Sequence, residues 1–531
     1  MMLAQQVGVQ RPLLEVVESD DVALESRTDV LWYEVFRRFD YLQWRALGAQ
    51  YYEGLWAFNI EQAKKRAIKD SLPLNEENKG LATLRLVGER ATVSETVPAL
   101  FDQPVADRSL DHVNPAEIRP GVTPLRFAGR QPKCFFAMFK AFLAMTVRGV
   151  PPEPEHVYEE FVSNPAFARA CGFTLPESDG PYRQSDFPSL RKVQQFDQIM
   201  TDNGLWSAAA VSQVARNFET GVIKPEGTIV HDTTHYQAYS GMTVVELPQL
   251  ATSKAEPKSK SHPKTTKNCR CKDRNQCPHP WVSADDGAGT VVKSGGKMHW
   301  AHKASTLALP GQGVLLDAVA MSDAASHDSN SVVTHLSRLF GLYPHLEAVV
   351  SRVLDDAAAD DQPLKDEVER DFGIELLTGM NPRGRRPITA DLPRGIDHIT
   401  ATGTPVCQAG LPFDFLGCRH DSRLFIFRAP SDEKGNSVCN GCPLREGCYR
   451  GDSNGRTITV PFDRLPWIDP EFPQLSRRFQ KVMAQRTAIE RMHKLMKYDY
   501  GDERLSKRGN SAFQARLDKT LLAMHVVLAL K

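Results

Sequence analysis

The chain has 531 residues, and its 65 Lys and Arg balance its 65 Asp and Glu, so its formal net charge is zero. This length predicts roughly three domains, and a neutral chain gives no overall support for a nucleic-acid binder. No run of about 18 uncharged apolar residues exists, so we expect no membrane span. The first residues lack the pattern of a secretory signal, and we expect a cytoplasmic protein.

The first 225 residues carry helical patterns. Residues 1–110 predict a helical N-terminal region of unknown role, and residues 111–225 predict a helical domain. Within that domain, segment 133–147 is apolar nearly all round, which indicates a buried helix. Segments 186–205 and 208–218 place apolar residues at helical spacing. Paired amphipathic helices of this kind fit a domain that binds DNA ends, and they fit a scaffold equally well.

From residue 226 the pattern changes to strands and helices in alternation. The expected strands are 227–236, 298–306, 313–324, a strand running into a loop over 348–360, and 373–380. The expected helices between the last three strands are 328–340 and 362–372. An order of three strands, helix, strand, helix, strand predicts the α/β fold class for residues 226–380.

Two segments interrupt this alternation. Segment 251–295 is rich in Lys, Ser, Pro and Gly and predicts an inserted loop. Its part 253–274 holds eight Lys or Arg against two acidic residues, which fits a DNA contact or an ordinary solvated loop. Residues 381–470, rich in Pro, Gly, Arg and Cys, predict an insertion domain, and helices resume over 471–531. The two helices expected there are 474–498 and 511–530.

The strongest local motif is RTAIERMHKLMK at residues 486–497. On a helix its Arg486, Glu490 and Lys497 return to one face, because each residue turns by about 100°. A carboxylate between two cations stays ionised and can bind a hard cation such as Mg²⁺. The cations themselves can hold DNA phosphates. The same pattern also occurs on exposed helices that carry salt bridges four residues apart.

The spacing R-x3-E-x6-K resembles the signature around the catalytic glutamate of insertion-sequence DDE transposases. The family also places a Tyr three residues before the Arg, where this chain has Met483. The resemblance implies that Glu490 is catalytic and that Arg486, Lys494 and Lys497 bind DNA.

Other blocks resemble the same family in the same order. HDTT at 231–234 resembles the strand that holds the first catalytic aspartate, which implies this role for Asp232. KMHWAHKAS and VAMSDAASHDS follow in the family's order. RVLDDAAADD at 352–361 resembles the family's "VLADRGYDS" and implies that Asp356 is the second aspartate. Asp355 stays open as the rival, because the family's Gly–Tyr is missing here.

The resemblance implies a ribonuclease H-like mixed sheet with flanking helices, preceded by a helical domain and interrupted by a Cys-rich insertion. Three carboxylates would hold two Mg²⁺ or Mn²⁺ ions for phosphoryl transfer, first by water and then by a DNA 3′-OH. The implied partners are double-stranded DNA, as terminal inverted repeats and target, and a second copy of the chain. The implied location is the nucleoid. Three alternatives stay open: a nuclease that does not join DNA, an inactive DNA-binding derivative, and a zinc-stabilised interaction protein.

The cysteines form two groups whose spacing suits zinc. The first, C-x-C-x5-C-x-H, lies in the basic loop and consists of Cys269, Cys271, Cys277 and His279. The second consists of Cys407, Cys418, Cys439, Cys442 and Cys448. Thiolates at such spacing suit structural Zn²⁺, and CNGCPLREGC resembles a Cys-rich knuckle of related transposases. The candidate zinc ligands are Cys418, Cys439, Cys442 and Cys448. The alternative is reduced cysteines packed in a small subdomain.

Five histidines lie near the blocks that carry the aspartates, and no role is assigned to any of them. They are His231, His235, His299, His302 and His327.

Overall fold

The structure is a computed structural model, and the residues that it describes leave several gaps in the chain. The described residues are 27–69, 134–173, 175, 182–239, 242–244, 281–283, 285, 287–292, 298–449, 455–501 and 504–530. The basic segment 253–274 and the first cysteine group therefore lie outside the described residues. Among the described helices, none combines the length and the apolar character needed to cross a membrane.

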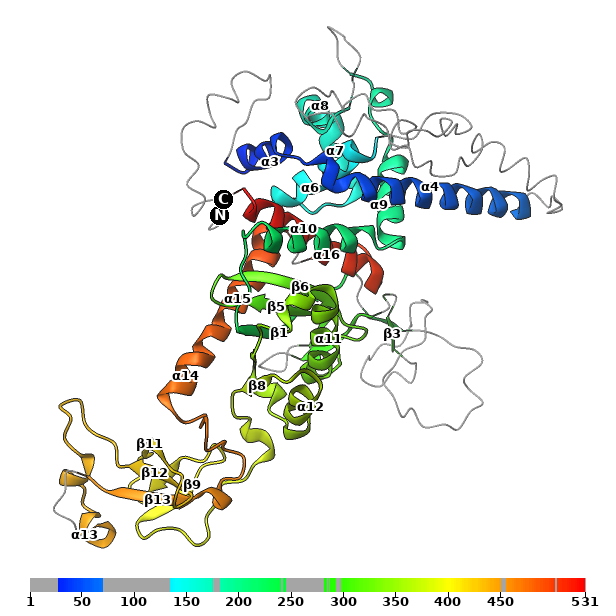
Figure 1. Ribbon diagram of the computed structural model, residues 1–531. Helices are drawn as coiled ribbons and strands as arrows, with labels where there is room; N and C mark the ends of the chain where they lie inside the picture. Colours follow the sequence, from blue (N-terminus) through cyan, green and yellow to red (C-terminus); the bar gives the residue numbers. More distant parts are fainter. Residues whose placement is uncertain are drawn as a thin grey trace, which may run out of the picture.

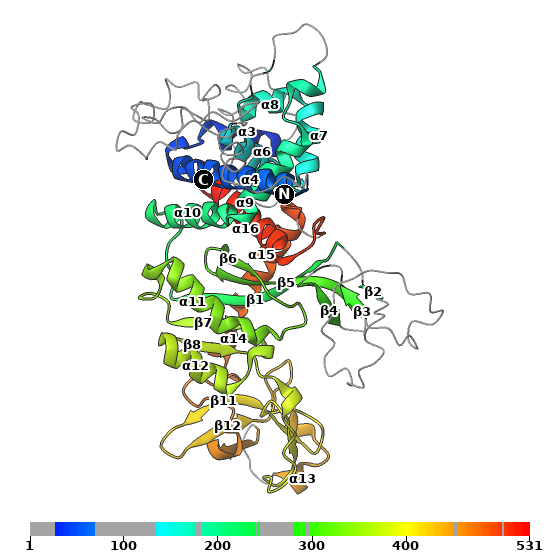
Figure 2. The same ribbon diagram turned by 90° about the vertical axis from the view of Figure 1, so that its right-hand side faces the viewer.

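A six-stranded mixed sheet lies at the centre of the molecule, as Figures 1 and 2 show from two sides. Its strands are β1 (Thr228–Gln237), β4 (Gly289–Val292), β5 (Met298–Leu309), β6 (Val314–Ala320), β7 (Arg352–Asp355) and β8 (Glu375–Thr378). β1 pairs antiparallel with β5 and parallel with β7, and β7 pairs parallel with β8. β4 and β6 pair antiparallel with successive parts of the other edge of β5. The fold is therefore mixed α/β, and all five predicted strands are confirmed.

The predicted loop 251–295 is wrong for its last part, which contains strands. β3 (Trp281–Ser283) pairs with β2 (Met242–Val244), and β4 pairs with the first residues of β5. The Gly-rich composition around β4 favours turns. The free edge of β5 supplies hydrogen-bond partners that local composition cannot reveal.

Helices cover both faces of the sheet. Ser305 and Thr306 are neighbours on β5, so their side chains lie on opposite faces. Ser305 bonds to His335 of α11 (Val332–Leu342), whereas Thr306 bonds to His493 of α15 (Thr487–Lys494). Thus α11 and α15 lie on opposite faces, and α12 (Gln362–Phe372) packs against β8.

A layer of helices packs against the β6 side of the sheet (Figure 1). It consists of α3 (Arg27–Arg37), α4 (Tyr41–Lys69), α6 (Phe135–Val147), α7 (Pro154–Ser163), α8 (Pro165–Cys171), α9 (Leu190–Asp202), α10 (Leu205–Glu219) and α16 (Asn510–Leu528). Every residue of α6 is buried, as its uniform apolar sequence predicts. α16 contacts α10, α6 and β6, so the end of the chain joins the helical layer to the sheet.

Residues 381–470 form a small β-rich unit away from the helical layer (Figure 1). Its elements are β9 (Ile396–Ile399), β10 (Pro405–Cys407), β11 (Asp414–Arg419), β12 (Leu424–Arg428), α13 (Arg445–Cys448) and β13 (Thr457–Pro461). Its buried residues, such as Phe425 and Phe427, form a hydrophobic cluster separate from the main core. α14 (Arg477–Met483) and α15 then lead back to the sheet.

Within the helical layer, a buried group of charges joins α9 and α10 to the C-terminal helix α16. Asp197 of α9 is 3% exposed and accepts hydrogen bonds from Lys519 of α16 at 2.5 Å and from Lys507 at 2.6 Å. Trp206 of α10 donates its indole N–H to the same carboxylate at 3.1 Å. Burial alone would raise the pKa of Asp197, but the two lysines outweigh it and hold the pKa below its ordinary value.

We predict that Asp197→Asn destabilises the fold by about 3–5 kcal/mol, because it leaves the buried Lys519 without its counter-charge. Asp202→Asn is the matched control, since Asp202 lies on the same helix but is exposed. We expect the control to change the free energy of unfolding by no more than about 0.5 kcal/mol. Urea unfolding followed by tryptophan fluorescence measures both, and equal midpoints for the two variants would contradict the prediction.

Candidate catalytic carboxylate site

An arginine links two of the predicted catalytic carboxylates. Asp232 lies on β1 at the centre of the sheet, and its carboxylate accepts a hydrogen bond from Arg486 Nη1 at 3.2 Å. Arg486 Nη2 donates to Glu490 at 2.8 Å. Arg486 and Asp232 are 254 residues apart in the chain. The structure thus brings Asp232 and Glu490 to the same guanidinium group.

Two of the three residues of the predicted shared face, Arg486 and Lys497, contact β1, whereas the Glu490 side chain is 55% exposed. Asp232, Thr234 and Tyr236 alternate along the strand and so lie on one face. Arg486 contacts Asp232, while Lys497 donates to Thr234 Oγ1 at 2.5 Å and lies 5.0 Å from the centre of the Tyr236 ring. The shared face of Arg486 and Lys497 is confirmed, whereas Lys494 is exposed to solvent.

The helical path from α14 to α15 is irregular where these two cations lie. Residues Ala484–Arg486 form a turn of 3-10 helix, and Leu495–Asp499 form a turn of π-helix. The predicted helix 474–498 is therefore confirmed as a helical region but is not uniform. Such turns change the direction of side chains, and π-helical turns are frequent at functional sites.

Two polar side chains fix α15 over β1. The Thr306 hydroxyl donates to the backbone oxygen of Asp232 at 2.9 Å, and it lies 2.7 Å from His493 Nε2. Since the hydroxyl hydrogen is already used, His493 Nε2 must carry the proton and donate to Thr306. Burial, together with Lys497 and Arg486, lowers the pKa of His493 to about 3. His493 is therefore neutral and acts as a fixed hydrogen-bond donor.

Burial decides the protonation of Asp232. It raises the pKa of Asp232 to about 6, and Arg486 is the largest influence in the opposite direction. The carboxylate is thus mostly ionised at neutral pH while it pairs with Arg486. A negative group held in this way can accept hydrogen bonds or bind a hard cation.

Asp355 lies on the opposite face of the sheet. Its carboxylate is 1% exposed and is 2.7 Å from His231 Nδ1. His231 Nε2 in turn contacts Ser305 Oγ at 2.8 Å. Burial alone would lower the pKa of His231, but the Asp355 carboxylate outweighs it and the pKa of His231 is raised. Asp355 therefore takes part in a buried hydrogen-bond network under α11.

Asp356 directly follows β7, and its backbone is still extended, with φ −78° and ψ 177°. In the parallel pairing, Val230 lies opposite Leu354. The pairing of β1 with β7 ends there, and Asp356 begins the 3-10 turn Ala357–Ala359 that follows the strand. Asp356 Oδ1 accepts a hydrogen bond from the Ala358 N–H at 2.6 Å, and the side chain is half-buried.

The side chains that could bind a metal ion at this site are carboxylates. Within the described residues, no three His, Cys, Asp or Glu side chains lie close enough together to form a metal-binding group as they stand. Arg486 instead supplies the positive charge shared by Asp232 and Glu490. Carboxylate oxygens are the donors that Mg²⁺ and Mn²⁺ prefer, so the chemistry of this donor set fits these ions.

Sequence reasoning missed the residues that support the site from within the core. Thr306, His493, Ser305 and His335 are all buried and bond across elements. His493 lies inside the quoted motif, three residues after Glu490, but its partner is 187 residues away in the chain. Only the three-dimensional pairing of β1, β5 and α15 reveals such contacts.

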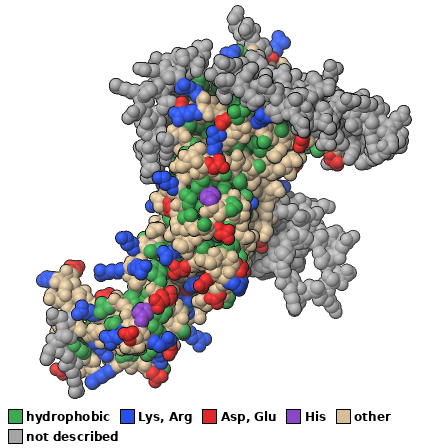
Figure 3. Space-filling view, in the orientation of Figure 1, with side chains coloured by type: hydrophobic (Ala, Val, Ile, Leu, Met, Phe, Trp, Pro, Cys, Tyr) green, Lys and Arg blue, Asp and Glu red, His purple; other side chains and the backbone are tan. Residues whose placement is uncertain are grey.

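Exposed basic side chains lead up to this site along α14. Arg477, Arg478 and Lys481 are exposed on that helix, and we call these three residues the basic ridge. Figure 3 shows Lys and Arg side chains gathered on the edge of the molecule where α14 runs. Residues 477–497 hold seven Lys or Arg against a single Glu, so this helical path is strongly positive in a neutral chain.

Comparisons with known proteins assign no family. No protein-family model matches the chain, and no curated protein matches its sequence. Among solved structures, one match is a piggyBac transposase seen by cryo-electron microscopy in a synaptic complex with hairpin DNA. The match has a TM-score of 0.28 and 8% sequence identity, and covers 75% of this chain and 66% of that chain. At these values it assigns neither a family nor an activity.

The two neighbouring aspartates give a prediction about stability. We expect Asp355→Asn to destabilise the fold by about 3 kcal/mol, because it removes the buried charge that pairs with His231. Asp356→Asn should cost no more than about 0.5 kcal/mol, because Asn still accepts the Ala358 hydrogen bond. Urea unfolding measures both variants.

The pH dependence provides the control for the Asp355 prediction. Because the pKa of His231 is higher in the folded chain than in the unfolded chain, its pairing with Asp355 stabilises the fold fully below a pH of about 6.5. This stabilisation is lost as the pH rises through the pKa of His231 in the folded chain. The difference between the natural chain and Asp355→Asn should therefore shrink as the pH rises above neutrality. A difference that grows with pH would contradict the assigned ion pair.

Proposed function

We propose that this protein is a metal-dependent DNA transposase that cuts DNA at the ends of an element and joins them to a target. Asp232, Asp356 and Glu490 are the proposed catalytic carboxylates. Arg486 and Lys497 are the proposed contacts to DNA phosphates beside them, and Lys494 is an outer one. The proposed core is ribonuclease H-like and is formed by residues 226–380 and 471–531.

The order of the sheet supports this core. Along the chain, three antiparallel strands (β1, β5 and β6) come first, followed by β7 and β8, which run parallel to β1. Side by side, they lie in the order β6, β5, β1, β7, β8. This is the arrangement that the resemblance to DDE transposases implies. It pairs the two central strands, β1 and β7, in parallel, with Asp232 on β1 and Asp356 directly after β7.

The observation that carries the proposal is the Arg486 bridge. A helix from the far end of the chain lies on the central strand in such a way that Glu490 and Asp232 share one guanidinium. An exposed helix with incidental salt bridges would not pack its Arg486 and Lys497 against a buried strand. The bridge therefore favours the catalytic interpretation of the R-x3-E-x6-K motif over the structural one.

The proposed ions would be held by Asp232, Asp356 and Glu490. When bound, divalent ions supply the activation of an attacking oxygen and the stabilisation of a leaving oxygen in phosphoryl transfer. The chain's own residues prepare the site for this. Thr306 and His493 hold the backbone at Asp232, and Arg486 keeps that carboxylate mostly ionised.

The proposed partner is double-stranded DNA. The basic ridge offers exposed cations that lead to the carboxylates, as a phosphate-binding path requires. We further propose that the helical domain, residues 111–225, binds the element ends and that two copies of the chain act together on paired ends.

The catalytic assignment predicts the loss of DNA cleavage on neutralising a single carboxylate. We expect Glu490→Gln and Asp356→Asn each to lower the cleavage rate by at least about a thousandfold, because each removes one charged ligand with little change of shape. The assay uses supercoiled DNA that carries the gene's own flanking sequences, with Mg²⁺ or Mn²⁺. Glu369→Gln, an exposed change on α12, is the matched control and should cleave like the natural chain.

The outcomes of this assay separate the alternatives. Equal cleavage by Glu490→Gln and the natural chain would remove Glu490 from the mechanism. Cleavage without any joined product would indicate a nuclease rather than a transposase. If the natural chain binds DNA but no divalent ion supports cleavage, an inactive DNA-binding derivative is favoured.

The basic ridge gives a separate prediction about DNA affinity. Each phosphate contact contributes about 0.9 to the slope of log binding constant against log salt concentration. We therefore expect Arg477→Gln with Lys481→Gln to lower that slope by about 2. Arg370→Gln with Lys434→Gln removes two exposed cations elsewhere and should leave the slope unchanged. The same slope for both double variants would show that the ridge does not contact DNA.

A further inference from the structure

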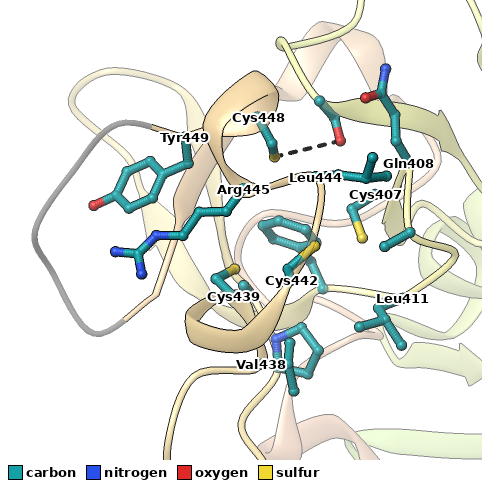
Figure 4. Close-up of a pocket in the computed structure, with 15 residues that line it drawn as sticks. Cys407, Gln408, Leu411, Val438, Cys439, Cys442, Leu444, Arg445, Cys448 and Tyr449 are labelled. Atoms are coloured by element: carbon teal, nitrogen blue, oxygen red, sulfur yellow. Dashed lines mark hydrogen bonds between the residues drawn. The ribbon is translucent and has the colours of Figure 1, made fainter.

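Four cysteines from separate parts of the insertion line one small cavity. Cys407 ends β10, whereas Cys439, Cys442 and Cys448 come from the loop that contains α13. The cavity has a volume of about 30 Å³, which suits a single ion or water molecule but no organic cofactor. Figure 4 shows these four side chains around the same space, together with apolar neighbours such as Leu411.

Tight turns shape the loop that carries three of these cysteines. The Cys442 N–H donates to the Cys439 oxygen at 3.3 Å, which folds the C-x2-C segment back on itself. The Cys448 N–H donates to the Leu444 oxygen at 3.1 Å. On the opposite side, the pairing of β10 with β9 is irregular between Val406 and Cys407, and an irregularity of this kind re-aims a side chain.

A buried cation lies next to one of the sulfurs. Arg456 is 8% exposed, and its Nη1 donates to Cys448 Sγ at 2.8 Å. Arg456 thus places a positive charge beside one sulfur of the cavity. Gly395 lies against the same sulfur with a φ of +75°, and a side chain there would collide with Cys448 Sγ and Arg456. The backbone at Gly395 therefore lies too close to this thiol to accept a side chain.

Cys418, which the sequence pattern placed in the zinc set, lies elsewhere. It is on β11, paired opposite Phe425, and it does not line the cavity. Burial raises the pKa of the Cys418 thiol, and Asp469 and Glu471 raise it further. Both its position and its acidic neighbours make Cys418 a poorer metal ligand than Cys407.

We propose that Cys407, Cys439, Cys442 and Cys448 bind one structural Zn²⁺ as a tetrathiolate. Four thiolates in tetrahedral geometry are a common structural zinc site, and the ions selected by soft sulfur donors include zinc. The sulfurs do not form a ligand group as they stand in the described chain. Binding would draw the four inward around the cavity and release the protons that the thiols carry.

A structural ion has a clear physical role here. The insertion has its own small hydrophobic core, separate from the main one. Small cores often need a metal or a disulfide to be stable. The proposed ion would link β10 to the loop that carries α13, beside this core. This inference is independent of the proposed catalytic activity.

The test measures zinc in the full chain, with Cys269→Ser and Cys271→Ser present throughout to remove the other cysteine group. We expect about one equivalent of zinc per chain after purification in reducing buffer. Cys407→Ser should lose that zinc, whereas the matched control Cys418→Ser should keep it. Loss of zinc in Cys418→Ser with full retention in Cys407→Ser would overturn the ligand set.

A second measurement covers variants that fail to fold. X-ray absorption at the zinc edge of the chain with Cys407 intact should show four sulfur neighbours at about 2.3 Å. Replacement of zinc by Co²⁺ should produce the near-ultraviolet charge-transfer band of thiolate ligands. Absence of bound zinc and of this band, or a Cys439–Cys442 disulfide found by mass analysis without reductant, would overturn the proposal.

Discussion

Two acidic side chains that lie close together repel each other unless one takes up a proton or a positive charge lies between them. Here Arg486 supplies that charge to Asp232 and Glu490, and it does so from the same helix that carries Glu490. This contact fixes how α15 lies on β1, which in turn positions Lys497 over Thr234 and Tyr236.

The opposite face of the sheet stabilises the strands that carry the site. Asp355, His231, Ser305 and His335 form a connected set of buried polar contacts, which continues through Asp317 to Arg338 of α11. Buried polar groups cost free energy unless they are all paired. A network that crosses β7, β1, β5 and α11 therefore permits only one register of these strands. The site on the other face depends on that register.

Local patterns in the sequence were sufficient to predict many of the helices and strands, including the helix that carries the R-x3-E-x6-K motif. The apolar spacing of α6 and α9, the five strands and the shared face of Arg486 and Lys497 all follow from periodicity. Contacts between distant segments were not accessible in this way. β4 needed the free edge of β5, and His493 needed Thr306 as a partner. In the insertion, Cys418 and Cys407 are equivalent by spacing, and only the folded chain shows that Cys407 lines the cavity.

The local sequence also left open whether Asp355 or Asp356 matches the second aspartate of the family, and the two residues have different contacts in the fold. Asp355 is the last residue of β7 and Asp356 is the first residue after it, so the two side chains belong to different local structures. The hydrogen bond from His231 holds Asp355 on the α11 side. Asp356 lies just beyond β7, is half-buried, and accepts a hydrogen bond from the Ala358 N–H. Two adjacent acids in the sequence thus have different surroundings in the fold, because one is buried in a polar network and the other lies at the end of the strand.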